Sequence, residues 1–199
     1  MKYRHVILEG KPATGKTEIS NLFKIFFPTK VIILPELATI LTRENGLNIL
    51  KHRKELADLL VEHVPRRKLE VQELLAAHPD AMVLEESHMG VHQAYCQVVQ
   101  DRFFLDRYES EVRPNELVPD LYLRLDIPLG LSWRRQLARA TKDVEVDSEL
   151  VRNAWNLVDV WHAERGNKNI VIVDTNKSPD RYIREVLDVL GIEYDVFAD

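Results

Sequence analysis

Eight residues near the start of the chain have the types and the spacing that hold a nucleotide phosphate. They match the pattern G-x-x-x-x-G-K-[ST] and are Gly10, Lys11, Pro12, Ala13, Thr14, Gly15, Lys16 and Thr17. The two glycines permit backbone conformations that side chains forbid, so that successive N–H groups can point at a phosphate. Lys16 is expected to reach the β- and γ-phosphates, and the Thr17 hydroxyl to hold Mg²⁺. The segment therefore predicts a site for ATP and Mg²⁺.

The residues on both sides of this loop supply the context that the motif needs. An apolar run, Val6 to Leu8, leads into the loop, and apolar residues at helical spacing follow from Ile19 to Phe26. A helix that begins near Lys16 adds its free N–H groups and the positive end of its dipole to the phosphate site. The alternative is a turn between strand and helix without a ligand, but the lysine and threonine favour the phosphate loop.

Apolar runs and helical patterns alternate along the chain, which predicts an α/β fold with a parallel sheet. The expected strands are Arg4–Glu9, Lys30–Pro35, Ala81–Leu84, Leu121–Asp126 and Asn169–Asp174. The expected helices are Lys16–Phe26, Leu47–Ala77, Met89–Asp106, Leu129–Ala140, Ser148–Arg165 and Pro179–Leu190. Pro65 is expected to kink or divide the long second helix. We expect a three-layer P-loop NTPase fold, with helices on both faces of five parallel strands.

Carboxylates follow three of the expected strands, at the edge where such sheets bind ligands. Glu36 follows the second strand, Glu85 and Glu86 end the third, and Asp126 ends the fourth. Beside a nucleotide, such groups hold metal, accept a proton or bind the hydroxyls of an acceptor. Two alternatives are structural: Glu36 as an acid favoured by a helix dipole, and Asp126 as the cap of the next helix, which we prefer for Asp126.

Composition points to an ordinary soluble protein. The chain has 199 residues and a net charge of −5, with acids and bases interspersed, so a nucleic-acid partner is not expected. Cys96 is the only cysteine, which argues against disulfides and favours the cytoplasm. No apolar run approaches the roughly 20 residues of a membrane-spanning helix. We expect residues 1–199 to form a single domain without a membrane partner.

The motifs, taken in order, resemble the deoxynucleoside kinase and thymidylate kinase group of P-loop kinases. The resemblance runs from Val6 to about Lys177. It rests on Ile-x-Glu-Gly before the loop, Pro-Glu after the second strand, Glu-x-Ser after the third, and Leu-Asp-x-Pro with later arginines after the fourth. The resemblance implies transfer of a phosphoryl group from ATP to a hydroxyl of a small molecule.

The resemblance assigns roles to the carboxylates. Glu36 matches the general base that acts on the acceptor hydroxyl, and Glu85 matches the acid of a Glu-Arg-Ser motif near Mg²⁺. Glu86 stands where the family has an arginine, which inverts a charge that faces the acceptor. A phosphate on the acceptor would be repelled there unless another cation compensates Glu86, so a neutral or cationic acceptor is favoured.

The resemblance also assigns the cations that follow the fourth and fifth strands. Arg135 and Arg139 match arginines of a lid, here about residues 134–147, that closes over the transferred group. Asn176 and Lys177 fall in the loop that lies against adenine in the family. Without the phosphate loop, the arginines would read as the solvated face of a helix.

His88 and His92 lie four residues apart on the helix expected after the third strand. This is a spacing of metal ligands, but no third ligand is evident in the sequence, so we prefer a polar lining of the acceptor pocket.

Three functions remain open. The first is a kinase for a nucleoside or nucleoside-like acceptor, and the second a kinase for another acceptor, such as a nucleoside monophosphate, an antibiotic hydroxyl or a hydroxymethylated base in DNA. The third is a nucleotide-dependent switch or accessory ATPase that binds a protein. The long segment Leu47–Ala77 could also form a homodimer.

Overall fold

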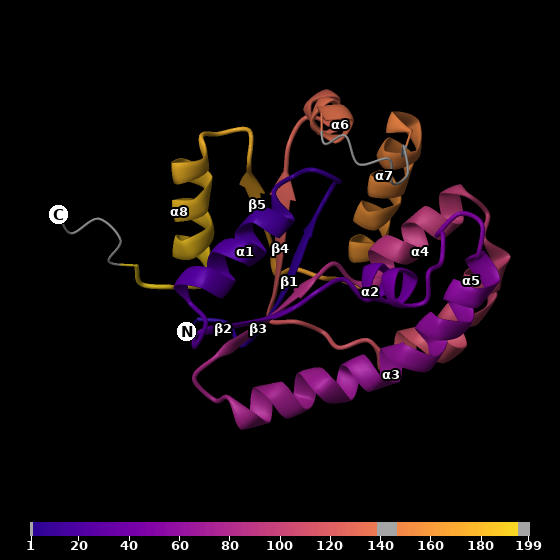
Figure 1. Cartoon of the computed structure of the whole chain (residues 1–199), viewed down its shortest axis with the longest axis horizontal. Coiled ribbons are helices and arrows are strands. Elements are labelled where there is room, and N and C mark those ends of the chain that lie inside the picture. Colours follow the sequence, from indigo (N-terminus) through magenta and orange to yellow (C-terminus); the bar gives the residue numbers. More distant parts are fainter. Residues whose placement is uncertain (1, 139–146, 195–199) are drawn as a thin grey trace.

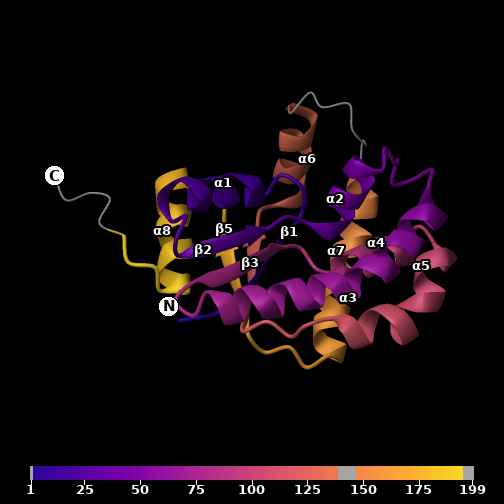
Figure 2. The same ribbon diagram turned by 60° about the horizontal axis from the view of Figure 1, so that its bottom comes forward.

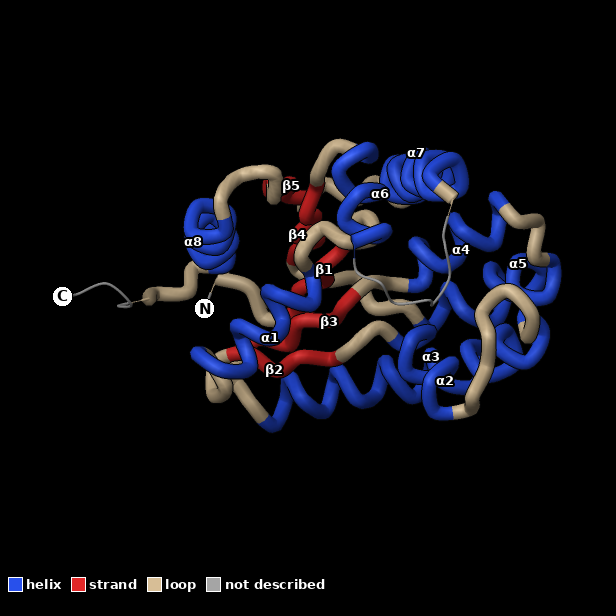
Figure 3. The backbone as a smooth tube through the Cα atoms, turned by 45° about the horizontal axis from the view of Figure 1, so that its top comes forward, coloured by secondary structure: helices blue, strands red, loops and turns tan. Residues whose placement is uncertain are grey.

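Five parallel strands form one sheet in the computed structural model, which describes residues 2–138 and 147–194. The strands are β1 His5–Gly10, β2 Val31–Leu34, β3 Met82–Glu86, β4 Leu121–Asp126 and β5 Ile170–Asp174. Their order across the sheet is β2-β3-β1-β4-β5, as Figure 3 shows. Every neighbouring pair is parallel, so the carboxyl ends of all five strands share one edge. The predicted five-stranded parallel sheet is confirmed.

Helices connect the strands. Their bounds are α1 Lys16–Phe26, α2 Leu37–Glu44, α3 Arg53–Ala77, α4 Met89–Val98, α5 Arg102–Arg107, α6 Leu129–Ala138, α7 Ser148–Glu164 and α8 Pro179–Leu190. A π-helical turn, Tyr108–Val112, and a 3₁₀ turn, Arg113–Asn115, follow α5. Among the described residues, no helix is both long and apolar enough to cross a membrane.

Both faces of the sheet are covered. Alternate side chains of a strand point to opposite faces, so Val6 and Leu8 pack with Phe23 of α1 and Leu187 of α8. Ile7 points the other way and packs against Trp161 of α7. Figure 1 shows α1 and α8 on one side of the sheet and α4 and α7 on the other. The helices thus form two outer layers around the strands, as predicted.

The long helix α3 differs from the prediction at its start and at its proline. It begins at Arg53, not at Leu47, and continues through Pro65 to Ala77, so the expected division is wrong. Proline removes one hydrogen bond from a helix. Leu60 and Val64, just before it, are buried in a cluster with α2 and α5, and this packing holds the helix together. Figure 2 shows α3 as one continuous helix.

The single helix expected over residues 89–106 is two helices. Gln100 lies in the left-handed region, with φ 54°, which ends α4. Asp101 then caps α5, because its carboxylate accepts the backbone N–H of Phe103 at 3.1 Å. Apolar periodicity continues across this break, so the pattern alone does not show it.

Candidate functional site

The phosphate loop has the backbone that its pattern predicts. It connects β1, which ends at Gly10, with α1, which begins at Lys16. Gly15 has φ 106° and Ala13 φ 59°, both in the left-handed region. At Gly10 a Cβ atom would lie 2.5 Å from the carbonyl oxygen of Leu125, so only glycine fits there.

Hydroxyl groups from distant parts of the chain hold this loop. Ser132 of α6 donates to the carbonyl of Pro12 at 2.7 Å, and Thr175 after β5 donates to the carbonyl of Thr14 at 2.7 Å. Within the loop, Thr14 donates to the carbonyl of Lys11 at 2.9 Å. Sequence reasoning missed Ser132 and Thr175, because their partners lie 120 and 161 residues away and no local pattern marks them.

The two lysines of the loop have different neighbours. The ammonium of Lys16 donates to the carbonyls of Gly10, at 2.6 Å, and Lys11, at 3.2 Å, and so lies along the inside of the loop. The ammonium of Lys11 makes an ion pair with Asp126. The capping role preferred for Asp126 is wrong, since α6 begins only at Leu129 and the carboxylate binds Lys11.

The helix α6 brings one arginine to the phosphate loop. The guanidinium of Arg135 donates to the carbonyls of Ala13 and Thr175, both at 3.4 Å. Its neighbour Arg134 is exposed, and within residues 2–138 and 147–194 its guanidinium bonds only to the carbonyl of Gly130 in its own helix. The alternative of a solvated helix face therefore does not describe Arg135, which lies against the loop.

Much of the expected lid is beyond what the structure describes. Arg139 lies within residues 139–146, outside the described residues, so its assignment stays a prediction. Asn176 and Lys177 are exposed after the carboxyl end of β5, and Lys177 pairs with Glu185 of α8 at 2.7 Å. Their contact with adenine also stays a prediction.

Glu36 stands between β2 and α2. It occupies the position before the first residue of α2, but its side chain makes no capping hydrogen bond to the helix backbone. Its carboxylate accepts the hydroxyl of Thr39 at 2.7 Å and lies partly buried at a cavity. The geometry leaves one carboxylate oxygen of Glu36 without a hydrogen bond among the described residues.

The two glutamates at the end of β3 point to different surroundings. Glu85 accepts from His5 at 2.7 Å and lies 3.7 Å from Arg67 of α3. Because His5 begins β1, this contact draws the Glu85 carboxylate back from the carboxyl edge. Glu86 makes no hydrogen bond or ion pair within the described part of the chain, and both glutamates line the same cavity as Glu36. The role of Glu85 as a magnesium ligand stays a prediction.

The cavity has a volume of about 370 Å³ and lies beside the ends of β2 and β3. Residues from these ends, from α3, from the segment after α5 and from α7 line it, among them Glu36, Val64, Glu86, Leu117, Trp161 and Arg165.

The arginines that line this cavity already have partners. Arg67 pairs with Glu70 at 3.2 Å, and Arg113 with Glu109 at 2.5 Å. Arg165 stacks on the Trp161 ring, 4.1 Å from its centroid, and donates to Tyr108 and Glu116. These arginines are compensated, whereas Lys68, which lines the same cavity, bonds only to the carbonyl of Pro114, at 3.2 Å, among the described residues. Glu36 and Glu86 likewise make no ion pair within the described part of the chain.

The two candidate histidines do not form a ligand pair. His88 caps α4 with Nδ1, and its Nε2 contacts Glu9 at 2.8 Å, so both ring nitrogens are engaged. His92 packs edge-on against Phe104, with ring centroids 4.7 Å apart, and burial lowers its pKa to about 4. His88 lines the cavity, and His92 is not part of the lining that the structure describes.

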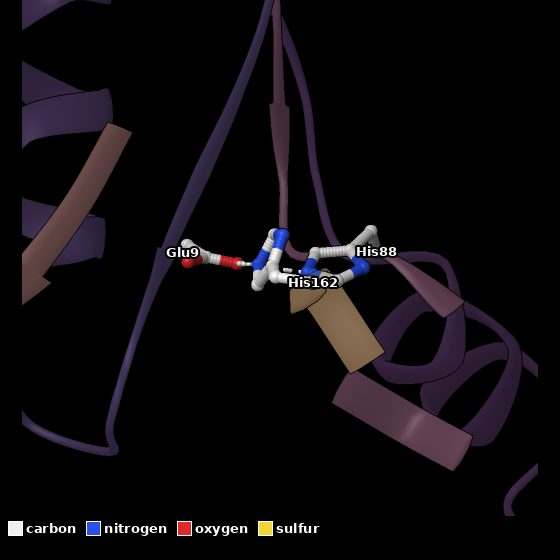
Figure 4. A group of neighbouring side chains, drawn as sticks. All are labelled: Glu9, His88 and His162. Atoms are coloured by element: carbon white, nitrogen blue, oxygen red, sulfur yellow. Dashed lines mark hydrogen bonds and ion pairs between the residues drawn. The ribbon is translucent and has the colours of Figure 1, made fainter. Parts of the chain in front are cut away.

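A buried cluster beneath the phosphate loop was not foreseen. Glu9, the residue before Gly10, is completely buried, and its carboxylate contacts His88 at 2.8 Å and His162 of α7 at 3.0 Å (Figure 4). It also contacts Arg124 of β4 at 2.5 Å. Burial by itself raises the pKa of a carboxyl group. The hydrogen bonds from His162 and His88, with the charge of Arg124, outweigh that effect and hold the pKa of Glu9 well below its usual value.

One signal for part of this cluster was present in the sequence. Glu9 and Arg124 are opposite charges inside two apolar strands, and a buried charge needs a partner. The structure places them directly opposite in neighbouring strands. The histidines carry no such signal, because His162 lies 153 residues from Glu9.

These features define a P-loop fold with the strand order β2-β3-β1-β4-β5, a phosphate loop after β1 and a cavity at the same sheet edge. No protein-family model matches the sequence, and no curated protein matches it.

Solved structures do share the fold. Deoxyadenosine kinase from M. mycoides, with the products dCMP and a flexible dCDP bound, is similar with a TM-score of 0.67 and 11% identity, over 94% of this chain and 98% of that one. The same enzyme with bound dCTP or dATP is similar with a TM-score of 0.61 and 13% identity, over the same shares. The fold that the sequence motifs predict is thus confirmed.

Proposed function

We propose that this protein is a kinase that moves the γ-phosphoryl group of ATP to a hydroxyl of a small molecule. The observation that carries the proposal is the shared sheet edge: the phosphate loop with Arg135 against it, and next to it a cavity that carries Glu36. The similar structures are of a deoxyadenosine kinase with bound deoxynucleotides, which supports a nucleoside or nucleoside-like acceptor.

The described residues fit the needs of phosphoryl transfer. The transition state is loose and spreads charge over the phosphoryl oxygens, so the enzyme must position the acceptor and neutralise those oxygens. Lys16 and Arg135 lie at the loop to neutralise them, and arginine suits the task because its planar fork pairs with two oxygens. Glu36 would orient the acceptor hydroxyl and accept its proton.

The loop also fits Mg²⁺. Thr17 is exposed in the first turn of α1, and its hydroxyl makes no hydrogen bond within the described part of the chain. A hydroxyl oxygen is the kind of ligand that Mg²⁺ prefers. When bound, the ion would neutralise charge on the β- and γ-phosphates.

The cavity favours an acceptor without a phosphate. Its volume of about 370 Å³ is within the usual range of roughly 300–1,000 Å³ for small-molecule sites. Among the described residues, the carboxylates of this lining that make no ion pair, such as Glu36 and Glu86, outnumber the one such cation, Lys68. The balance of charge repels an anionic acceptor and attracts a cationic one. The acceptor is therefore a neutral or cationic hydroxyl compound.

A thermal-shift screen with a non-hydrolysable ATP analogue and Mg²⁺ tests this acceptor class. Nucleosides and amine-bearing hydroxyl compounds should include stabilising ligands, whereas nucleoside monophosphates should not stabilise the protein. A ligand at 100 times its dissociation constant adds about 2.7 kcal/mol to the free energy of unfolding, which a melting curve detects.

Two variants distinguish the effect of the Glu86 charge at the cavity from the effect of a change in the net charge of the protein. Glu86→Gln should reduce the discrimination against monophosphates, because it removes the repelling charge. Glu73→Gln, on an exposed part of α3, makes the same charge change elsewhere and should leave the ranking of ligands as it is. Stabilisation of the wild-type protein by a monophosphate but not by its nucleoside would refute the proposed acceptor class.

Arg135→Ala should lower kcat by roughly 10²-fold while the affinity for ATP changes much less, because the guanidinium is needed most when charge develops on the transferred group. Steady-state kinetics together with direct ATP-binding measurements check this. Arg134→Ala removes the same charge from the neighbouring exposed position and serves as the control. Equal effects of the two substitutions would show that α6 contributes only general positive charge.

A further inference from the structure

The carboxylate of Glu9 anchors the chain directly beneath the phosphate loop. The next residue is Gly10, so no flexible segment separates the buried carboxylate from the loop. Its partners come from three other elements: Arg124 from β4, His88 from the start of α4 and His162 from α7. Figure 4 shows the carboxylate and the two imidazoles facing one another.

The hydrogen bonds define the protonation of both histidines. Nδ1 of His88 accepts the backbone N–H of Gly90 at 3.2 Å, so the neutral ring carries its proton on Nε2 and donates it to Glu9. Nδ1 of His162 lies 3.1 Å from the side-chain nitrogen of Asn167, which donates to it in the same way. Both histidines are therefore neutral donors to one carboxylate, and Arg124 supplies the opposite charge.

This arrangement does not suit a metal ion, although the three ligand atoms of Glu9, His88 and His162 lie within 4.8 Å of one another. A histidine that binds a metal through Nε2 donates its other ring N–H to an acceptor. Here Nδ1 of His88 faces the N–H of Gly90, which is a donor. A metal on Nε2 would put the ring proton on Nδ1, where it would face the N–H of Gly90. The positive charge of the metal would also add to that of Arg124.

We propose that Glu9 is a positioning residue, which His88 and His162 hold in place so that the phosphate loop stays in its nucleotide-binding position. A buried carboxylate that loses a donor bears a large desolvation cost, so it moves toward other polar groups. Because Gly10 follows at once, such a movement displaces the loop. The inference rests on the proposed binding of ATP at that loop.

The test compares His162→Leu with His162→Gln. Neither substitution touches the loop or the cavity lining, since His162 contacts Glu9 from α7. Leucine removes the donor, whereas the glutamine amide can still donate to Glu9. Measured well below each melting temperature, the affinity for ATP and Mg²⁺ should fall about tenfold or more in His162→Leu, and His162→Gln should restore most of it.

Leu190→Ala is the control for lost stability. Leu190 is buried against the opposite face of the sheet, in α8, so this variant should melt earlier and still bind ATP normally. If His162→Leu does not fold, Asn167→Ala is the milder variant. It keeps both histidines, removes the amide that orients His162, and should weaken ATP binding in the same direction. Because Asn167 also lines the cavity, this variant is measured without an acceptor, by ATP affinity alone.

The outcomes separate the inference from the proposed function. Suppose that the wild-type protein binds ATP. If His162→Leu binds it equally well, or if Leu190→Ala weakens binding as much as His162→Leu does, the positioning role is wrong and the proposed function still stands. If the purified wild-type protein contains stoichiometric zinc and His162→Leu contains none, His88 and His162 are metal ligands and not neutral hydrogen-bond donors to Glu9. A wild-type protein that binds no nucleotide would overturn the proposed function, and the inference with it.

Discussion

Lys16→Ala should reduce phosphoryl transfer by at least about 10²–10³-fold, the usual cost of removing one donor that stabilises developing charge. The ammonium lies along the inside of the phosphate loop, 2.6 Å from the carbonyl of Gly10, where a bound phosphate would replace that carbonyl as its partner. The side chain is not part of the apolar core, so the fold should persist. Steady-state kinetics and far-UV circular dichroism of the purified variant check both statements.

Lys24→Ala provides the matched control. Lys24 lies in the last turn of the same helix, α1, and is exposed, so this variant loses an equal charge away from the loop. It should retain wild-type turnover. Normal turnover in Lys16→Ala as well would mean that the loop does not hold the transferred phosphate, and the kinase proposal would fail at its first step.

The fold was predictable because each element carries its own local signal. The central strands of this sheet are covered on both faces and therefore appear as short apolar runs, such as Leu121–Asp126, whose bounds match β4. The break between α4 and α5 was not predictable in this way. It depends on the left-handed backbone of Gln100, a residue type for which that conformation is uncommon, and on the cap that Asp101 provides.

The site was predictable only where chemistry requires a fixed spacing. The phosphate loop needs two glycines, a lysine and a threonine at set positions, so its pattern identified it. The residues that support it follow no such spacing: Thr175 and His162 reach the loop and Glu9 from the far end of the chain. Their positions follow from the packing of β5 and α7 on the sheet, which apolar periodicity does not specify.

The surroundings of the two glutamates at the end of β3 could likewise not be predicted from the sequence. Glu85 and Glu86 are neighbours of the same type, and alternation in a strand sends them to different surroundings. Both line the cavity, but Glu85 is bound to His5 and lies near Arg67, whereas Glu86 has no hydrogen bond or ion pair among the described residues. This difference bears directly on which carboxylate accepts the proton of the acceptor.

Glu36→Gln should slow transfer to the acceptor by roughly 10²–10⁴-fold, because glutamine keeps the size of the side chain and its contact with Thr39 but cannot accept a proton. The affinity for ATP should hardly change, since the phosphates bind at the loop after β1. Pre-steady-state transfer measurements, with ATP binding measured separately, distinguish the two quantities. Glu44→Gln, at the exposed end of the same helix, α2, is the matched control and should react normally.

The same measurements identify the base if it is not Glu36. A missing base suppresses deprotonation of the acceptor and leaves slow transfer to water, whereas Arg135→Ala should suppress both reactions, because both need the charge on the phosphoryl group neutralised. Suppose that Glu36→Gln transfers normally while Glu86→Gln is inactive. The base would then lie at the end of β3, where Glu86 faces the cavity, and Glu36 would be only a carboxylate at the start of α2 that accepts the hydroxyl of Thr39.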